Sequence, residues 1–93
     1  MNISNYKKVL KQIKEHPETW DQNEFHSPDK DKHSFLGWTQ ILSGSGLLFW
    51  PVSGNHLISF LEISWTDFDY LLNADRTLAD FERFLEEKEK DEQ

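Results

Sequence analysis

Apolar residues recur along this chain at helical spacing, in short segments that polar turns separate. In the first segment, residues 4–16, they lie three or four positions apart and form one stripe: Ile3, Tyr6, Leu10 and Ile13. Ser4 or Asn5 can cap the start of this helix. His16 precedes Pro17, and a residue before proline avoids helical geometry, so we expect the helix to end there.

The segment from His33 to Gly46 predicts a central helix that neighbours surround on several sides, because it is apolar on more than one face: Phe35, Leu36, Trp38, Ile41 and Leu42. Gly37 lies inside it, where glycine costs roughly 1 kcal/mol relative to alanine. This cost indicates that a neighbouring backbone passes close by. Gly44 or Gly46 can end the helix in the left-handed conformation.

Three further helices are expected in the second half of the chain. One covers residues 53–63, with Ser53 or Asn55 as its cap, and a second opens at Ser64 or Thr66. The last begins at a capping box formed by Thr77 and Asp80 and frays from about residue 87. The side chains expected to face inward from these helices are Leu57, Ile58, Phe60, Leu61, Phe68, Leu71, Leu72, Leu78, Phe81, Phe84 and Leu85.

Two segments connect the expected helices. Residues 18–32 form a polar link that is long for a compact domain, so we expect a short helical turn or a pinned segment within it. Leu47 to Val52 is an apolar run that Pro51 prevents from being helical, so an extended segment is expected. The sequence thus predicts a single all-α domain of four to five short helices, with a core that includes Phe35, Trp38, Leu42, Phe60 and Phe81.

Composition and charge narrow the possible functions. The chain has 93 residues, no cysteine and a net charge of −7, so disulfides and thiolate metal sites are excluded. Residues 1–46 carry six basic and six acidic side chains, whereas residues 47–93 carry four and eleven. This distribution argues against nucleic-acid binding. It also favours a position of the acidic last helix near the lysine-rich first one.

Neither a signal peptide nor an apolar run of the ~20 residues that a membrane span requires is recognisable, so we expect a cytoplasmic protein that does not bind membranes.

Several ordered fragments resemble a known family. They are the stretch from His16 to Gln22, which reads HPETWDQ, the pair Gly37-Trp38 after His33, and Arg76-Thr77-Leu78. Together they resemble a small uncharacterised bacterial protein family, found in cyanobacteria and on mobile elements, with HPxxWxQ, His…Gly-Trp and RTL segments. The resemblance implies no activity. Relatives tend to have cysteine beside two histidines, where this chain has Ser27 and Ser34.

His26 and His33, with Asp29 between them, are the candidates for a metal site. Zinc sites use closely spaced pairs of His or Cys ligands, and this chain has none. Ser34 and Gln40 stand where a calcium loop starting at Asp29 requires glycine and glutamate. The sequence therefore predicts no metal and no stoichiometric zinc binding. It leaves open whether the two histidines meet, and it favours capping and turn hydrogen bonds as their role.

No catalytic constellation is recognisable. Ser43 to Gly46 lacks the preceding strand of a serine elbow, and Leu47 stands where a phosphate loop requires lysine. Four carboxylates lie at helix starts, where capping explains them: Asp67, Asp69, Asp75 and Asp80. A domain this small has little room for a substrate pocket. We therefore expect no enzymatic activity and no cofactor.

Two functional hypotheses follow. The first is a non-enzymatic module or adaptor that binds another protein through Leu47, Leu48, Phe49 and Trp50. The same four residues could instead fill the core. The second is an acidic inhibitor whose surface from Glu62 to Glu92 mimics nucleic acid toward a basic cleft. Salt separates these two hypotheses, because a charge mimic loses its partner steeply as salt rises.

Overall fold

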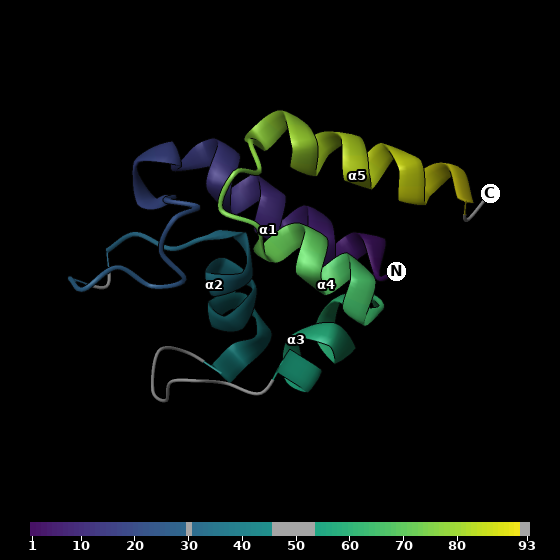
Figure 1. Cartoon of the computed structure of the whole chain (residues 1–93), viewed down its shortest axis with the longest axis horizontal. Coiled ribbons are helices and arrows are strands. Elements are labelled where there is room, and N and C mark those ends of the chain that lie inside the picture. Colours follow the sequence, from purple (N-terminus) through teal and green to yellow (C-terminus); the bar gives the residue numbers. More distant parts are fainter. Residues whose placement is uncertain (30, 46–53, 92–93) are drawn as a thin grey trace.

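The computed structural model describes residues 1–29, 31–45 and 54–91, and over these ranges the chain forms helices and turns, two isolated β-bridges and no strand. An all-α fold is thus confirmed (Figure 1). Residues 46–53, which include the expected extended segment Leu47 to Val52, lie outside the described ranges. The helices are α1 (Ile3–Glu15), the 3-10 turn η1 (Pro17–Thr19), α2 (Phe35–Gln40), the π-helical turn η2 (Ile41–Ser45), α3 (Gly54–Leu61), α4 (Trp65–Leu72) and α5 (Leu78–Asp91).

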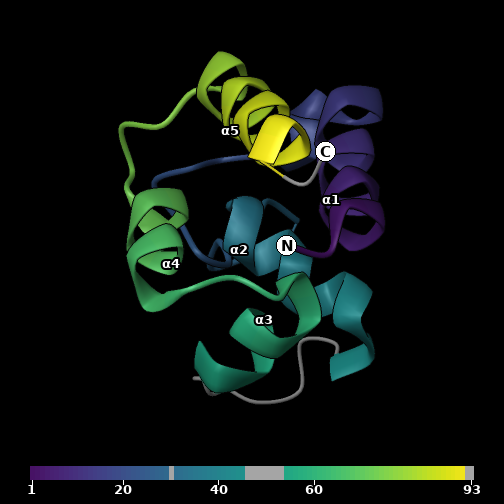
Figure 2. The same cartoon turned by 90° about the vertical axis from the view of Figure 1, so that its right-hand side faces the viewer.

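Helix α2 is the centre of the fold. It contacts α1, α3 and α4, which surround it in Figure 2. A Cβ atom at Gly37 would collide with the backbone carbonyl oxygen of Phe25, so only glycine lets that segment approach. The predicted close backbone is therefore confirmed. Gly44 has a φ of 91° and ends the helical run in the left-handed conformation, also as expected.

The core joins α1, α2 and α5 through aromatic rings. The Phe35 ring lies 4.9 Å from the Tyr6 ring and 4.6 Å from the Phe81 ring, between centroids, and all three side chains are fully buried. The Tyr6 hydroxyl donates a 2.7 Å hydrogen bond to the carbonyl oxygen of Phe81. Burial, with a smaller contribution from Tyr70, raises the pKa of Tyr6 well above that of a free tyrosine.

Helices α1 and α5 lie side by side, as the charge distribution predicts. The Lys14 ammonium is 2.9 Å from a Glu82 carboxylate oxygen, and that of Lys7 is 4.0 Å from Glu89. Exposed pairs of this kind stabilise a fold by only about 0–1 kcal/mol each. They nevertheless neutralise part of the acidic last helix.

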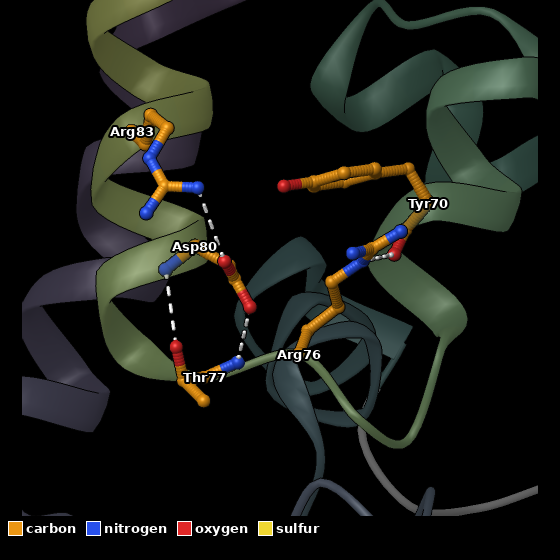
Figure 3. Close-up of polar contacts among 5 residues, drawn as sticks. All are labelled: Tyr70, Arg76, Thr77, Asp80 and Arg83. Carbon is orange, nitrogen blue, oxygen red and sulfur yellow. Dashed lines mark hydrogen bonds and ion pairs between the residues drawn. The ribbon is translucent and has the colours of Figure 1, made fainter.

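The helix caps follow local sequence. The Asn2 side chain accepts from the backbone N–H of Asn5, so α1 is capped by Asn2 and not by Ser4 or Asn5. Thr77 and Asp80 form the predicted capping box. The Thr77 N–H donates to the Asp80 carboxylate at 2.9 Å, and the Asp80 N–H donates to the Thr77 hydroxyl at 3.3 Å (Figure 3). The N–H of Thr77 is the main reason that the pKa of Asp80 is lowered.

Of the predicted core residues, Phe35 and Phe81 are fully buried, and Trp38 and Phe60 are half-buried and pack against the core. Leu42 is a correction, because 37% of it is exposed. An α-helix would place it on the face of Phe35, seven positions earlier. The regular helix α2 ends at Gln40, so Leu42 lies in the following turn, which contains a kink at Gly44.

Helix α5 continues through Asp91 in the described structure. The fraying expected from about residue 87 stays a prediction. The last turns of α5 are tied to two other helices. Lys88 is 3.1 Å from the Asp67 carboxylate on α4, and Glu89 pairs with Lys7 on α1. Tertiary contacts therefore extend a helix whose sequence alone supports it weakly.

Candidate protein-binding face

The fourth helix exposes large apolar side chains. The Ser64 hydroxyl accepts from the backbone N–H of Asp67 at 3.1 Å and so starts α4, the N-cap role expected of it. Leu71, on the inner side of α4, is fully buried. On the other side, 56% of Trp65 and 47% of Leu72 are exposed. These two residues lie seven positions apart, which places them on the same side of a helix.

Leu72 was expected to face inward, and this expectation is wrong. In an α-helix each residue is rotated by about 100° from the previous one, and the rest of the fold covers the Leu71 side of α4 but not the Leu72 side. Leu71 occupies the core, and Leu72 is turned outward. The Trp65 ring touches the half-buried Phe68 edge to face, with 5.4 Å between ring centroids. This edge-to-face contact supports one part of the indole.

The exposed side of α4 is also acidic. Asp69 lies four positions after Trp65 and three before Leu72, so it shares their side of the helix, and it is exposed. Exposed Glu62 and Asp75 flank the helix along the chain. No Lys or Arg occurs between Lys32 and Arg76, so this whole stretch contributes acidic charge only. We refer to Trp65, Leu72, Asp69, Glu62 and Asp75 as the α4 face.

Two cations from outside α4, Arg76 and Lys88, contact residues of this helix. The Arg76 Nε–H donates to the Tyr70 carbonyl at 3.0 Å, and its guanidinium lies 3.7 Å from the centre of the Tyr70 ring (Figure 3). Lys88 pairs with Asp67. Within the described residues, neither Asp69, Glu62 nor Asp75 makes an ion pair.

A second unusual region lies under the polar link, where Gln22 is buried. Its amide nitrogen donates to the carbonyls of Leu71 at 2.9 Å and Asn73 at 3.0 Å. Its amide oxygen accepts from the backbone N–H of Phe35 at 3.0 Å and from the Trp20 indole at 3.1 Å. Gln22 thus joins the start of α2 to the end of α4. Sequence reasoning missed this role, although Gln22 ends the HPxxWxQ segment.

The same region holds the two candidate metal ligands, and it brings them together. The Nδ1 atoms of His26 and His33 are 2.8 Å apart, and Nε2 of His26 is 3.0 Å from the Gln40 side-chain oxygen. All these contacts are satisfied with both rings neutral, if His33 donates to His26 and His26 donates to Gln40. Within the described ranges, no group of three or more His, Cys, Asp or Glu side chains could hold a metal ion. The absence of zinc binding stays a prediction.

The sequence-predicted contact residues Leu47, Leu48, Phe49 and Trp50 lie outside the described residues. Among those described, the large exposed apolar side chains are Leu42, Trp65 and Leu72. Two hollows of about 500 and 310 Å³ lie along the lysine side of α1, bordered by Lys7, Lys11 and their neighbours. They hold none of the catalytic groups that the sequence analysis considered.

Comparisons with protein-family models, with curated proteins and with solved structures give no match. Resemblance to the small bacterial family with HPxxWxQ and RTL segments therefore stays a prediction. No helix in the described ranges has both the length and the apolar character that crossing a bilayer requires.

Proposed function

We propose that this protein is a small non-enzymatic module that binds another protein through the α4 face. One observation carries the proposal: Trp65 and Leu72 are half exposed on the same side of one helix, although the domain is small and needs its apolar residues for its core. Tryptophan is among the residues most enriched at the energetic centres of protein interfaces. The segment Leu47 to Trp50 stays the second candidate for the contact.

The acidic-inhibitor hypothesis receives less support from the described contacts. An inhibitor that mimics nucleic acid needs a continuous row of unneutralised carboxylates. Along α5, Glu82 and Glu89 pair with lysines of α1, and Asp67 pairs with Lys88. The acidic surface from Glu62 to Glu92 is therefore interrupted by the protein's own cations.

Capture from cells that make the protein naturally tests this function. The bait proteins are the wild type, Trp65→Ser with Leu72→Ser, and Leu42→Ser as a matched control that removes an exposed leucine outside α4. We expect a protein that the wild type and Leu42→Ser retain and that the double variant loses by at least tenfold, as for a central interface residue.

The captured protein is then purified, and hydrogen exchange of the complex locates its contact. Protection of residues 62–73 supports the proposal. Equal capture by the folded double variant would contradict it and would direct attention to residues 47–50, which Trp50→Ala tests.

A further inference from the structure

We infer that the α4 face binds a basic amphipathic helix of another protein, with two apolar anchors flanked by lysine or arginine. This inference rests on the proposed function and adds the chemistry of the partner. It combines two features of the described surface: two exposed apolar anchors on one side of α4, and exposed carboxylates between them and beside them along the chain that make no ion pair with the described residues.

The spacing of the anchors suits a helix. Seven residues of α-helix rise about 10 Å, so Trp65 and Leu72 lie roughly that far apart along α4. A partner helix repeats this distance between its own residues i and i+7. One apolar stripe of the partner can therefore contact both anchors.

Charge determines which kind of helix fits. Asp69 lies between the two anchors, so a partner helix on this face places side chains close to its carboxylate. Exposed Glu62 and Asp75 add negative charge in the turns before and after α4. None of the three carboxylates makes an ion pair within the described residues, since Lys88 pairs with Asp67 and Arg76 lies against the Tyr70 ring. Lysine or arginine beside the partner's apolar stripe supplies the positive charge that pairs with these carboxylates.

A second copy of this chain fits less well. In a two-fold dimer through α4, Asp69 of each copy would face the acidic side of the other, and like charges across an interface are unfavourable. In a head-to-tail contact, α4 would meet the lysines of α1. Three of the four, Lys7, Lys11 and Lys14, already pair with glutamates of this chain. A separate basic partner avoids both conflicts.

Designed peptides test the inference on the full-length protein. The probe is an 18-residue helical peptide, a length of about five turns, with leucine at i, i+3, i+4 and i+7 and lysine at the flanking positions. Its matched controls are a peptide with glutamine in place of lysine and a scrambled peptide of identical composition without an apolar stripe. Binding is measured by titration calorimetry, and the contact is mapped by backbone amide NMR shifts.

We expect the basic amphipathic peptide to bind at least tenfold more tightly than either control, to shift amides of residues 62–75, and to weaken as salt rises. Trp65→Ser should reduce its affinity at least tenfold, and Asp69→Asn severalfold. Leu42→Ser and Glu18→Gln, which change an exposed leucine and an exposed carboxylate outside α4, should leave it unchanged.

The outcomes separate the two claims. If the glutamine peptide binds α4 as tightly as the lysine peptide, the function stands and the basic partner is wrong. If no peptide shifts α4 amides, or if Trp65→Ser binds normally, the inference is overturned, and native capture decides the function independently. Self-association of the free protein that Asp69→Asn strengthens would identify a second copy as the occupant and also overturn it.

Discussion

The buried polar cluster around Gln22 and the α4 face both depart from the usual rule that polar groups lie outside and large apolar groups inside. They differ in whether the chain itself provides bonding partners and cover for these side chains. Gln22 makes four hydrogen bonds, all to other parts of the same chain. Trp65 and Leu72 are left half exposed, and Asp69 between them makes no ion pair in the described structure.

This difference indicates how to interpret each region. A buried polar group that the protein fully satisfies serves the fold, because each unmade bond there would be costly. The end of α4 shows both cases within two residues, since the Leu71 carbonyl accepts from Gln22 while the Leu72 side chain faces outward. An apolar surface that the protein leaves uncovered is where a partner can gain free energy. The following predictions test that contrast.

The largest effect is expected from Gln22→Ala. It leaves the buried N–H of Phe35 and the carbonyl of Leu71 without this partner, so we expect a loss of about 3 kcal/mol in the free energy of unfolding. Urea unfolding followed by circular dichroism measures it. Asn23→Ala, an exposed neighbour, serves as control and should cost under about 0.5 kcal/mol. Equal, small losses for both variants would remove the structural role of Gln22.

Gly37→Ala should destabilise the fold by about 2 kcal/mol, because the added Cβ collides with the Phe25 carbonyl and forces two backbone segments apart. Thermal unfolding measures the loss. Gly44→Ala is an informative comparison, since Gly44 has open space around it but a positive φ. Any cost there arises from backbone conformation alone. An unchanged or raised melting temperature for Gly37→Ala would contradict the close packing.

Tyr6→Phe should cost about 1 kcal/mol near neutral pH, the typical net value of a lost hydrogen bond. It should also change the alkaline limit of stability. Because burial raises the pKa of Tyr6 in the folded protein, its contribution is complete below about pH 10, the ordinary tyrosine pKa, and is lost as pH rises above that value.

Denaturant unfolding at several pH values from neutral to strongly alkaline measures this effect. The wild type should lose stability more steeply than Tyr6→Phe above the ordinary tyrosine pKa. Tyr70→Phe keeps the buried hydroxyl of Tyr6 and removes only the smaller contribution to its raised pKa, so its curve should lie close to that of the wild type. Parallel curves for the wild type and Tyr6→Phe would refute the prediction.

The smallest effect on stability is expected at the α4 face. Trp65→Ser and Leu72→Ser should each cost about 1 kcal/mol or less, since both side chains are half exposed and Trp65 has one supporting aromatic contact. The same denaturant unfolding as for Gln22→Ala gives a direct comparison. A loss as large as that of Gln22→Ala would show that these residues are core, and the binding proposal would lose its main support.

Local patterns predicted much of the fold. The apolar stripe of α1, the caps at Ser64 and Thr77, the stop at Pro17 and the close backbone beside Gly37 are all confirmed, because short-range chemistry determines them. Leu42 was misplaced because the local apolar pattern does not show that the regular helix ends at Gln40.

The candidate site was less accessible from sequence. Helical periodicity alone does not show which of two adjacent leucines, Leu71 or Leu72, the neighbouring helices cover. The bonds of Gln22 to Leu71 and Asn73 join residues about fifty positions apart, beyond any local pattern. The signal that could have identified the α4 face is the i, i+7 pair Trp65 and Leu72, combined with the absence of basic residues between Lys32 and Arg76.

The contrast between the two regions is tested most directly with two variants, Trp65→Ser and Gln22→Ala. For each variant, the free energy of unfolding is measured, and so is the affinity for the basic amphipathic peptide. The affinity is measured under conditions where both variants are folded. We predict opposite profiles. Trp65→Ser should lose at least tenfold in affinity and about 1 kcal/mol or less in stability, whereas Gln22→Ala should lose about 3 kcal/mol in stability and little affinity. Unchanged affinity in Trp65→Ser, or a loss of affinity only in proportion to lost stability in both variants, would contradict the account.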